Sequence, residues 1–200
     1  RRLREFCDKH FDSVEVIGYV RDPASYMASA FQEMVKGSNI TRLDPRLIWP
    51  NYRQAFEKLD INFGKENVKL KIFEAARLVN GSVVDDFASE IRIYPEKDTV
   101  KFSNESLSLE ATALLFAQRK LGDGLVDGFA NVHQANARFI SFISSIGTRK
   151  FVFSNEFTAK ALEIYRDDIE WIEKRLGEPF QINKKDTFAS SAITTEDDLL

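Results

Sequence analysis

The residues best suited by type and spacing to do chemistry are an arginine and a serine eight positions apart, Arg21 and Ser29. An arginine guanidinium is a planar fork of donors that matches a phosphate group bidentately. A serine hydroxyl can add one further donor. If both side chains reach the same point, the pair predicts a phosphate-binding site.

The elements that would position these residues are a buried strand and the helix after it. The apolar, valine-rich run at 14–20 predicts a strand covered on both faces, as in a parallel sheet. Asp22 is a good N-cap, and Pro23 suits the first helical position. We expect the helix to run from Pro23 to about Lys36, with Gly37 as its stop.

This arrangement puts Arg21 at the carboxyl end of a strand and beside a helix N-terminus. Ligands bind at that edge of open α/β sheets, and helix N-termini favour anions. Ser25 and Ser29 are four residues apart and share one helical face. In the alternative interpretation, Arg21 pairs with Asp22 or another carboxylate, and both serines are ordinary surface residues.

Residues 19–23, Y-V-R-D-P, followed by Ser29, resemble the 3′-phosphate-binding motif of sulfotransferases that use 3′-phosphoadenosine-5′-phosphosulfate. In that family an arginine ends a strand, and a serine eight residues later lies in the next helix. The resemblance implies that Arg21 and Ser29 hold the 3′-phosphate of this co-substrate. It extends over roughly 14–177, through segments similar to bacterial sulfotransferase-like proteins of the polysaccharide-modifying kind: FGKENVKLKIFEAARLVNGSVVDDFASEI, SNESLSLEATALL and SNEFTAKALEIYRDDIEWIEKRLG.

The resemblance implies transfer of a sulfuryl group from the nucleotide to a hydroxyl or amine acceptor, such as a small molecule or a glycan. It also implies the P-loop-containing nucleotide-hydrolase fold, in which helices flank a parallel sheet, here with a mostly helical C-terminal half. The family usually places its catalytic base, a His or Glu, before the 3′-phosphate strand. His10 is the only histidine there and has the pattern of a helix surface, so we assign no catalytic residue.

One feature of the family is missing from this chain. No G-x-x-x-x-G-K-[ST] loop precedes the first strand to grip the 5′-phosphosulfate. We expect the loop upstream of Arg1, in a longer protein of which this chain is an N-terminally truncated part, or else absent. Two alternatives therefore stay open: a non-catalytic degenerate relative or interaction module, and a small-molecule kinase of the same fold with magnesium ligands at strand ends.

Composition narrows the class of protein. The chain has 200 residues and a net charge of −3, which argues against a nucleic-acid partner. The single cysteine, Cys7, and the two distant histidines, His10 and His133, predict no metal site. No apolar run is long enough to span a membrane. We expect a cytoplasmic protein, or alternatively a Golgi-lumen enzyme separated from its anchor; the acceptor and the oligomeric state stay open.

The rest of the chain predicts one domain over 1–177 and a mobile tail over 178–200. Apolar periodicity predicts helices at 50–63, 109–121, 125–146 and 155–176, and a further helix capped by Ser82. The alternation of apolar and basic residues at 67–73 predicts a second strand. Lys69 and Lys71 then form a solvated face of this strand, or alternatively contact an anionic substrate.

Overall fold

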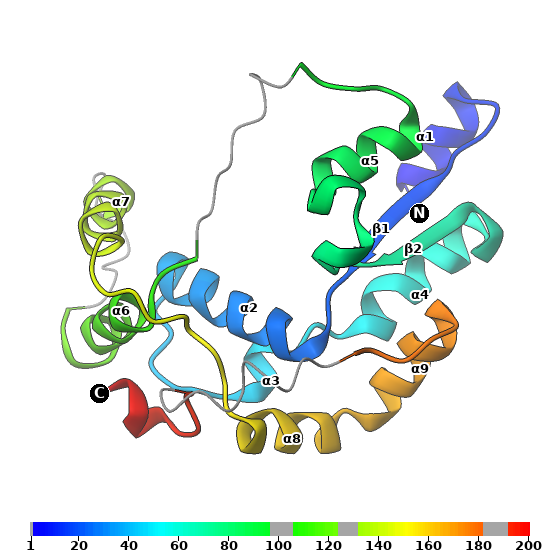
Figure 1. Cartoon of the computed structure of the whole chain (residues 1–200). Helices are drawn as coiled ribbons and strands as arrows, with labels where there is room; N and C mark the ends of the chain where they lie inside the picture. Colours follow the sequence, from blue (N-terminus) through cyan, green and yellow to red (C-terminus); the bar gives the residue numbers. More distant parts are fainter. Residues whose placement is uncertain (1, 97–105, 124–131, 182–191) are drawn as a thin grey trace. The chain divides into compact units, whose positions relative to one another are not determined.

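The computed structural model describes residues 2–96, 106–123, 132–181 and 192–200. These residues form an α/β fold that is mostly helical, with one small parallel sheet. The helices and strands of Figure 1 are, in chain order, α1 (Arg2–His10), β1 (Val16–Val20), α2 (Pro23–Gly37), α3 (Pro45–Ile48), α4 (Tyr52–Phe63), β2 (Val68–Ile72), α5 (Val83–Ile91), α6 (Leu109–Leu121), α7 (Val132–Ile143), α8 (Asn155–Ile164) and α9 (Arg166–Leu176).

The contacts within the chain divide it into two compact units. The first consists of residues 1–22, 50–103 and 165–181, and the second of residues 23–49, 104–164 and 182–200. The range 1–177, in which we expected one domain, is shared between both units. The boundary after Asp22 leaves strand β1 in the first unit and helix α2 in the second.

The first unit is built on strands β1 and β2, which pair in parallel from Val16 with Val68 to Val20 with Ile72. Both predicted strands are confirmed, with slightly shorter bounds. Helix α4 covers one face of this sheet and packs over Gly18 of strand β1, which has no side chain. A Cβ atom on Gly18 would lie 3.0 Å from Leu70 Cδ2 and 3.4 Å from the ring of Phe56. The glycine therefore lets helix α4 approach strand β1 closely.

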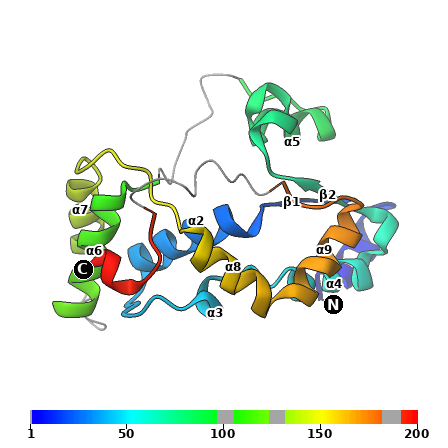
Figure 2. The same ribbon diagram turned by 60° about the horizontal axis from the view of Figure 1, so that its bottom comes forward.

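The apolar core under this face joins three elements. Cys7 of α1, Phe63 of α4 and Val68 of β2 are buried together. Helix α9 lies beside α4 (Figure 2) and fastens it to β2 through one arginine. Arg175 Nε and Nη2 donate to the Asp60 carboxylate at 2.8 and 2.9 Å, and Nη2 also donates to the Val68 carbonyl at 2.7 Å.

Helix α5 covers the other face of the sheet, where we expected solvated lysines. Lys71 instead forms ion pairs with Asp86 and Glu90, and Lys69 forms one with Glu90. The expectation of a solvated face is wrong for Lys71, because helix α5 brings two carboxylates over it. The predicted cap is confirmed, since the Ser82 hydroxyl accepts from the backbone N–H of Asp85.

The second unit has an aromatic core around helix α2. The ring of Phe31, which is 0% exposed, lies 5.5–5.9 Å from those of Phe116, Phe151 and Phe153. Helices α6 and α7 lie side by side in this unit (Figures 1 and 2). Helix α6 ends at Gly122 as predicted, whereas the first part of the helix predicted at 125–146 falls outside the described residues.

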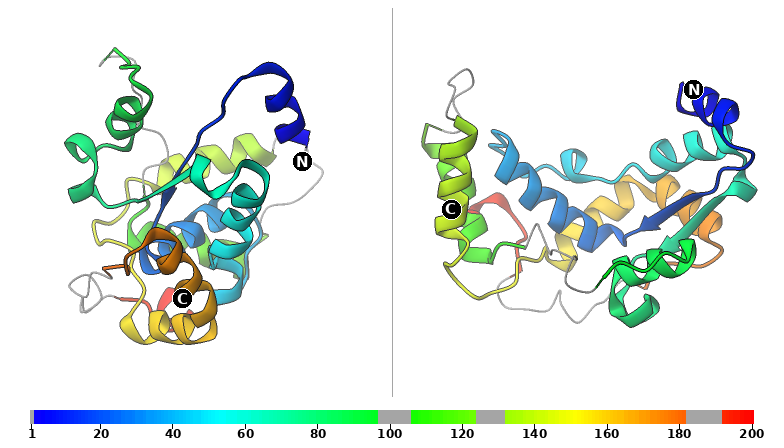
Figure 3. Two further views of the ribbon diagram at one scale, coloured as in Figure 1. Left: turned by 90° about the vertical axis from the view of Figure 1, so that its right-hand side faces the viewer. Right: turned by 90° about the horizontal axis from the view of Figure 1, so that it is seen from above.

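The C-terminal helix differs from expectation. The helix predicted over 155–176 is broken at Tyr165 into α8 and α9, which belong to different units. In the expected mobile tail, Ile193 and Leu199 are each only 2% exposed. The last residues, red in Figure 3, contact helix α6 in the second unit, where Glu196 pairs with Lys120.

Candidate functional site

The carboxyl ends of the two parallel strands meet at one edge of the sheet. Val20 and Ile72 are partners at this edge, and the backbone N–H of Phe73 donates to the Val20 carbonyl at 2.8 Å. Arg21 and Phe73 are therefore the first residues beyond the two strands. The sequence predicted the place of Arg21 correctly, and the parallel pairing makes it a typical ligand-binding edge.

Arg21 is fixed at this edge by its backbone and through its side chain. The Tyr52 hydroxyl donates to the Arg21 carbonyl at 2.6 Å. The guanidinium carbon of Arg21 lies 5.4 Å from the centroid of the Phe73 ring, within the range of a cation–π contact. The side chain is half-buried, and no carboxylate of the described residues forms an ion pair with it. The alternative pairing of Arg21 with Asp22 is not seen.

Ser29 lies on helix α2, whose predicted extent is confirmed within one residue. The buried side chains of this helix include Met27, Phe31 and Val35, at four-residue steps. Ser29 lies on another face, which by helical geometry it shares with Ser25. Its side chain is half-buried and makes no hydrogen bond with the described residues. Arg21 belongs to the first unit and Ser29 to the second, so each residue is described with its own neighbours.

Arg21 and Ser29 each offer a donor that suits a phosphate group. Arg21 offers a guanidinium whose charge no carboxylate of the described ranges neutralises, and Ser29 offers a hydroxyl. Guanidinium and hydroxyl donors are suited to a doubly charged phosphate monoester, and a guanidinium does not ligate metal ions. Among the described residues, no group of three His, Cys, Asp or Glu side chains is placed to hold a metal ion.

A second polar cluster lies on the α5 face of the sheet, and the sequence did not indicate it. The Asp86 carboxylate, 2% exposed, accepts from the Tyr19 hydroxyl at 2.7 Å and from the Lys71 ammonium. The bond from Lys71 is the main reason that the pKa of Asp86 is below its ordinary value. Lys69, and then Lys71, lower the pKa of Glu90 in the same way.

Tyr19 and Lys71 of this cluster hold their protons more tightly than usual. Burial, followed by the hydrogen bond to Asp86, raises the pKa of Tyr19 to about 12. Burial alone would lower the pKa of Lys71, but its bonds to Asp86 and Glu90 outweigh this effect and raise it. These shifts favour the ionised carboxylates of Asp86 and Glu90 and the protonated forms of Tyr19 and Lys71. Such a cluster fastens α5 to the sheet and is poorly suited to proton transfer.

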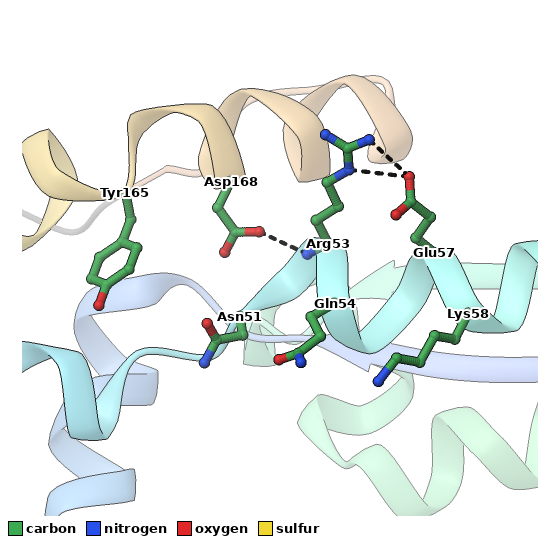
Figure 4. A pocket seen from close by; sticks show the side chains of 7 residues that line it. All are labelled: Asn51, Arg53, Gln54, Glu57, Lys58, Tyr165 and Asp168. Carbon is green, nitrogen blue, oxygen red and sulfur yellow. Dashed lines mark hydrogen bonds and ion pairs between the residues drawn. The ribbon is translucent and has the colours of Figure 1, made fainter.

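A polar hollow of about 410 Å³ lies between the first turns of helices α4 and α9 (Figure 4). Its lining includes Asn51, Arg53 and Asp168. The Asp168 carboxylate accepts from the backbone N–H groups of Tyr52 and Arg53 at 2.9 and 2.7 Å. The N-terminus of α4, which could have bound an anionic ligand, thus already holds a carboxylate of this chain.

Of the two histidines, only His10 has its side chain within the described residues. His10 lies on the exposed helix α1, where its ring is 4.5 Å from that of Phe6. The side chain of His133 lies outside the described residues.

No family model, curated protein or solved structure matches this chain. The candidate site therefore rests on the place of Arg21 at the end of strand β1 and on the donor chemistry of Arg21 and Ser29, each taken in its own unit. Within the described ranges, no helix combines the length and the apolar character needed to cross a bilayer.

Two residues at the edge, Tyr52 and Phe73, were missed as parts of the site. In the helix predicted at 50–63, Tyr52 stands at helical spacing from Phe56 and Phe63, a pattern that predicts one buried apolar face. The hydroxyl of Tyr52 was the available signal, because a buried tyrosine needs a hydrogen-bond partner where a phenylalanine does not. Which partner it finds depends on how helix α4 packs against the sheet.

Proposed function

We propose that this chain is part of a sulfotransferase that uses 3′-phosphoadenosine-5′-phosphosulfate and has the P-loop-containing nucleotide-hydrolase fold. In this proposal Arg21 and Ser29 bind the 3′-phosphate of the nucleotide. The acceptor is a hydroxyl or an amine on a small molecule or a glycan.

One observation carries the proposal. A half-buried arginine without a carboxylate partner among the described residues directly follows strand β1, at the edge where two parallel strands end. A cation in this position has lost part of its hydration and gains from an anionic ligand. The residues between Arg21 and Ser29 supply the strand-to-helix turn of the sulfotransferase motif, with helix α2 beginning at Pro23.

Each residue has a separate part in binding. Arg21 donates two hydrogen bonds to phosphate oxygens and supplies the positive charge, whereas Ser29 donates one hydrogen bond from the helix. Hydrogen bonds to charged groups contribute roughly 1.5–3 kcal/mol each. The 3′-phosphate, which distinguishes this nucleotide from ordinary adenosine phosphates, then contributes much of the affinity.

Calorimetric titration with adenosine 3′,5′-bisphosphate and with adenosine 5′-monophosphate tests the proposal. The bisphosphate is expected to bind with a Kd of micromolar order and at least about tenfold more tightly than the monophosphate. Ser29→Ala is expected to weaken the binding of the bisphosphate only. Ser38→Ala, which changes an exposed serine just beyond α2, is expected to weaken the binding of neither ligand. Equal binding of the two nucleotides, or of neither, contradicts the proposal.

A further inference from the structure

Tyr52 links helix α4 to the backbone of the proposed phosphate-binding arginine. Its side chain is only 1% exposed, and its hydroxyl donates to the Arg21 carbonyl at 2.6 Å. The Val20 carbonyl accepts the last hydrogen bond between the two strands, from the backbone N–H of Phe73. The next carbonyl along the chain is that of Arg21, which accepts from Tyr52. Tyr52 therefore holds the chain at the residue where it leaves the sheet.

Tyr52 is itself held from two sides within the first unit. Its backbone N–H donates to the Asp168 carboxylate of helix α9 at 2.9 Å. Its ring lies 5.7 Å from the ring of Phe180, which is buried after the end of α9. A tyrosine fixed at its backbone and along its ring presents its hydroxyl in one place, so the Arg21 carbonyl has a stationary donor.

We propose that Tyr52 is a positioning residue for the phosphate site at Arg21. Its bond to the carbonyl fixes the peptide plane that follows Arg21, and the Phe73 ring restrains the guanidinium 5.4 Å away. Together they limit the directions that the arginine side chain takes before a ligand arrives. An arginine whose side chain is already ordered loses less rotamer entropy on binding than a free one does. This inference rests on the proposed function.

The first test is the variant Tyr52→Phe, which keeps every carbon atom of the side chain and removes only the hydroxyl. The Kd for adenosine 3′,5′-bisphosphate is expected to rise about threefold to tenfold, as for the loss of one hydrogen bond. In an Arg21→Ala background the same change is expected to add nothing, because Tyr52 acts through Arg21. Tyr19→Phe is the matched control: it removes the hydroxyl that binds Asp86 instead and should leave the Kd unchanged.

The second test needs no nucleotide. ¹⁵N relaxation of the Arg21 Nε–H group, measured in the ligand-free protein, reports how tightly this side chain is ordered. We expect its order parameter to fall in Tyr52→Phe and to stay unchanged in Tyr19→Phe. An unchanged order parameter and an unchanged Kd in Tyr52→Phe overturn the positioning role, even where the wild type binds the bisphosphate.

The two tests separate this inference from the proposed function. If the wild type binds no bisphosphate but Arg21 loses order in Tyr52→Phe, the positioning role stands and the nucleotide proposal fails. If Tyr52→Phe weakens binding equally with and without Arg21, Tyr52 acts through the fold in general, and the inference is wrong.

Discussion

Lys71 of strand β2 and Asp86 of helix α5 form an ion pair in the first unit, with side chains 24% and 2% exposed. Removing a buried carboxylate from such a pair leaves its partners unmatched. We therefore expect Asp86→Ala to lower the free energy of unfolding by about 3 kcal/mol, measured by urea denaturation. Asp85→Ala removes an acid from the first turn of the same helix and should change it by about 1 kcal/mol or less. Equal effects of the two variants would show that the pair does not fasten α5 to the sheet.

The same cluster makes the free energy of unfolding depend on pH in the alkaline range. The pKa of Tyr19 is raised to about 12 in the folded protein, against an unfolded value of about 10. The folded state therefore binds this proton more tightly, and its contribution to stability is complete below pH 10 and lost as pH rises toward 12. Wild type should lose more stability across this window than Tyr19→Phe, as followed by urea denaturation at several pH values. Parallel losses in the two proteins would contradict the raised pKa.

The last residues of the chain are expected to stabilise the second unit. Leu199 is 2% exposed, whereas the adjacent Leu200 is 56% exposed. Leu199→Ala should lower the free energy of unfolding by about 2–4 kcal/mol, because it leaves a cavity in a packed interior. Leu200→Ala should change it by less than about 0.5 kcal/mol. If urea denaturation finds both substitutions neutral, this segment contributes nothing to the stability of the unit.

Local sequence signals predicted the ends of helices well where a proline or a glycine marks them. Helix α2 begins at Pro23, and helix α6 ends before Gly122, as expected. The break at Tyr165 was missed because apolar residues at helical spacing continue through it, from Leu162 to Ile169, with no glycine or proline to mark an end. Helices α8 and α9, on either side of this break, belong to separate units.

The sequence could not predict which side chains pair with residues far away along the chain. The alternation of Lys69 and Lys71 with apolar residues is the same whether water or a helix covers the lysine face. Asp86 lies 15 residues from Lys71, and nothing in that spacing indicates a contact. The place of Arg21 at the end of its strand was predictable because it depends on adjacent residues, whereas the bond from Tyr52, 31 residues away, was not.

Recognition of a 3′-phosphate by Arg21 can be tested with one ratio of dissociation constants. This is the ratio of the Kd for adenosine 5′-monophosphate to the Kd for adenosine 3′,5′-bisphosphate, measured by calorimetry for wild type and for Arg21→Ala. We predict a ratio of about ten or more for the wild type, falling toward one in Arg21→Ala, because the variant loses the charged donors that distinguish the two ligands. A wild-type ratio that survives the loss of Arg21 would place the recognition elsewhere and contradict the claim.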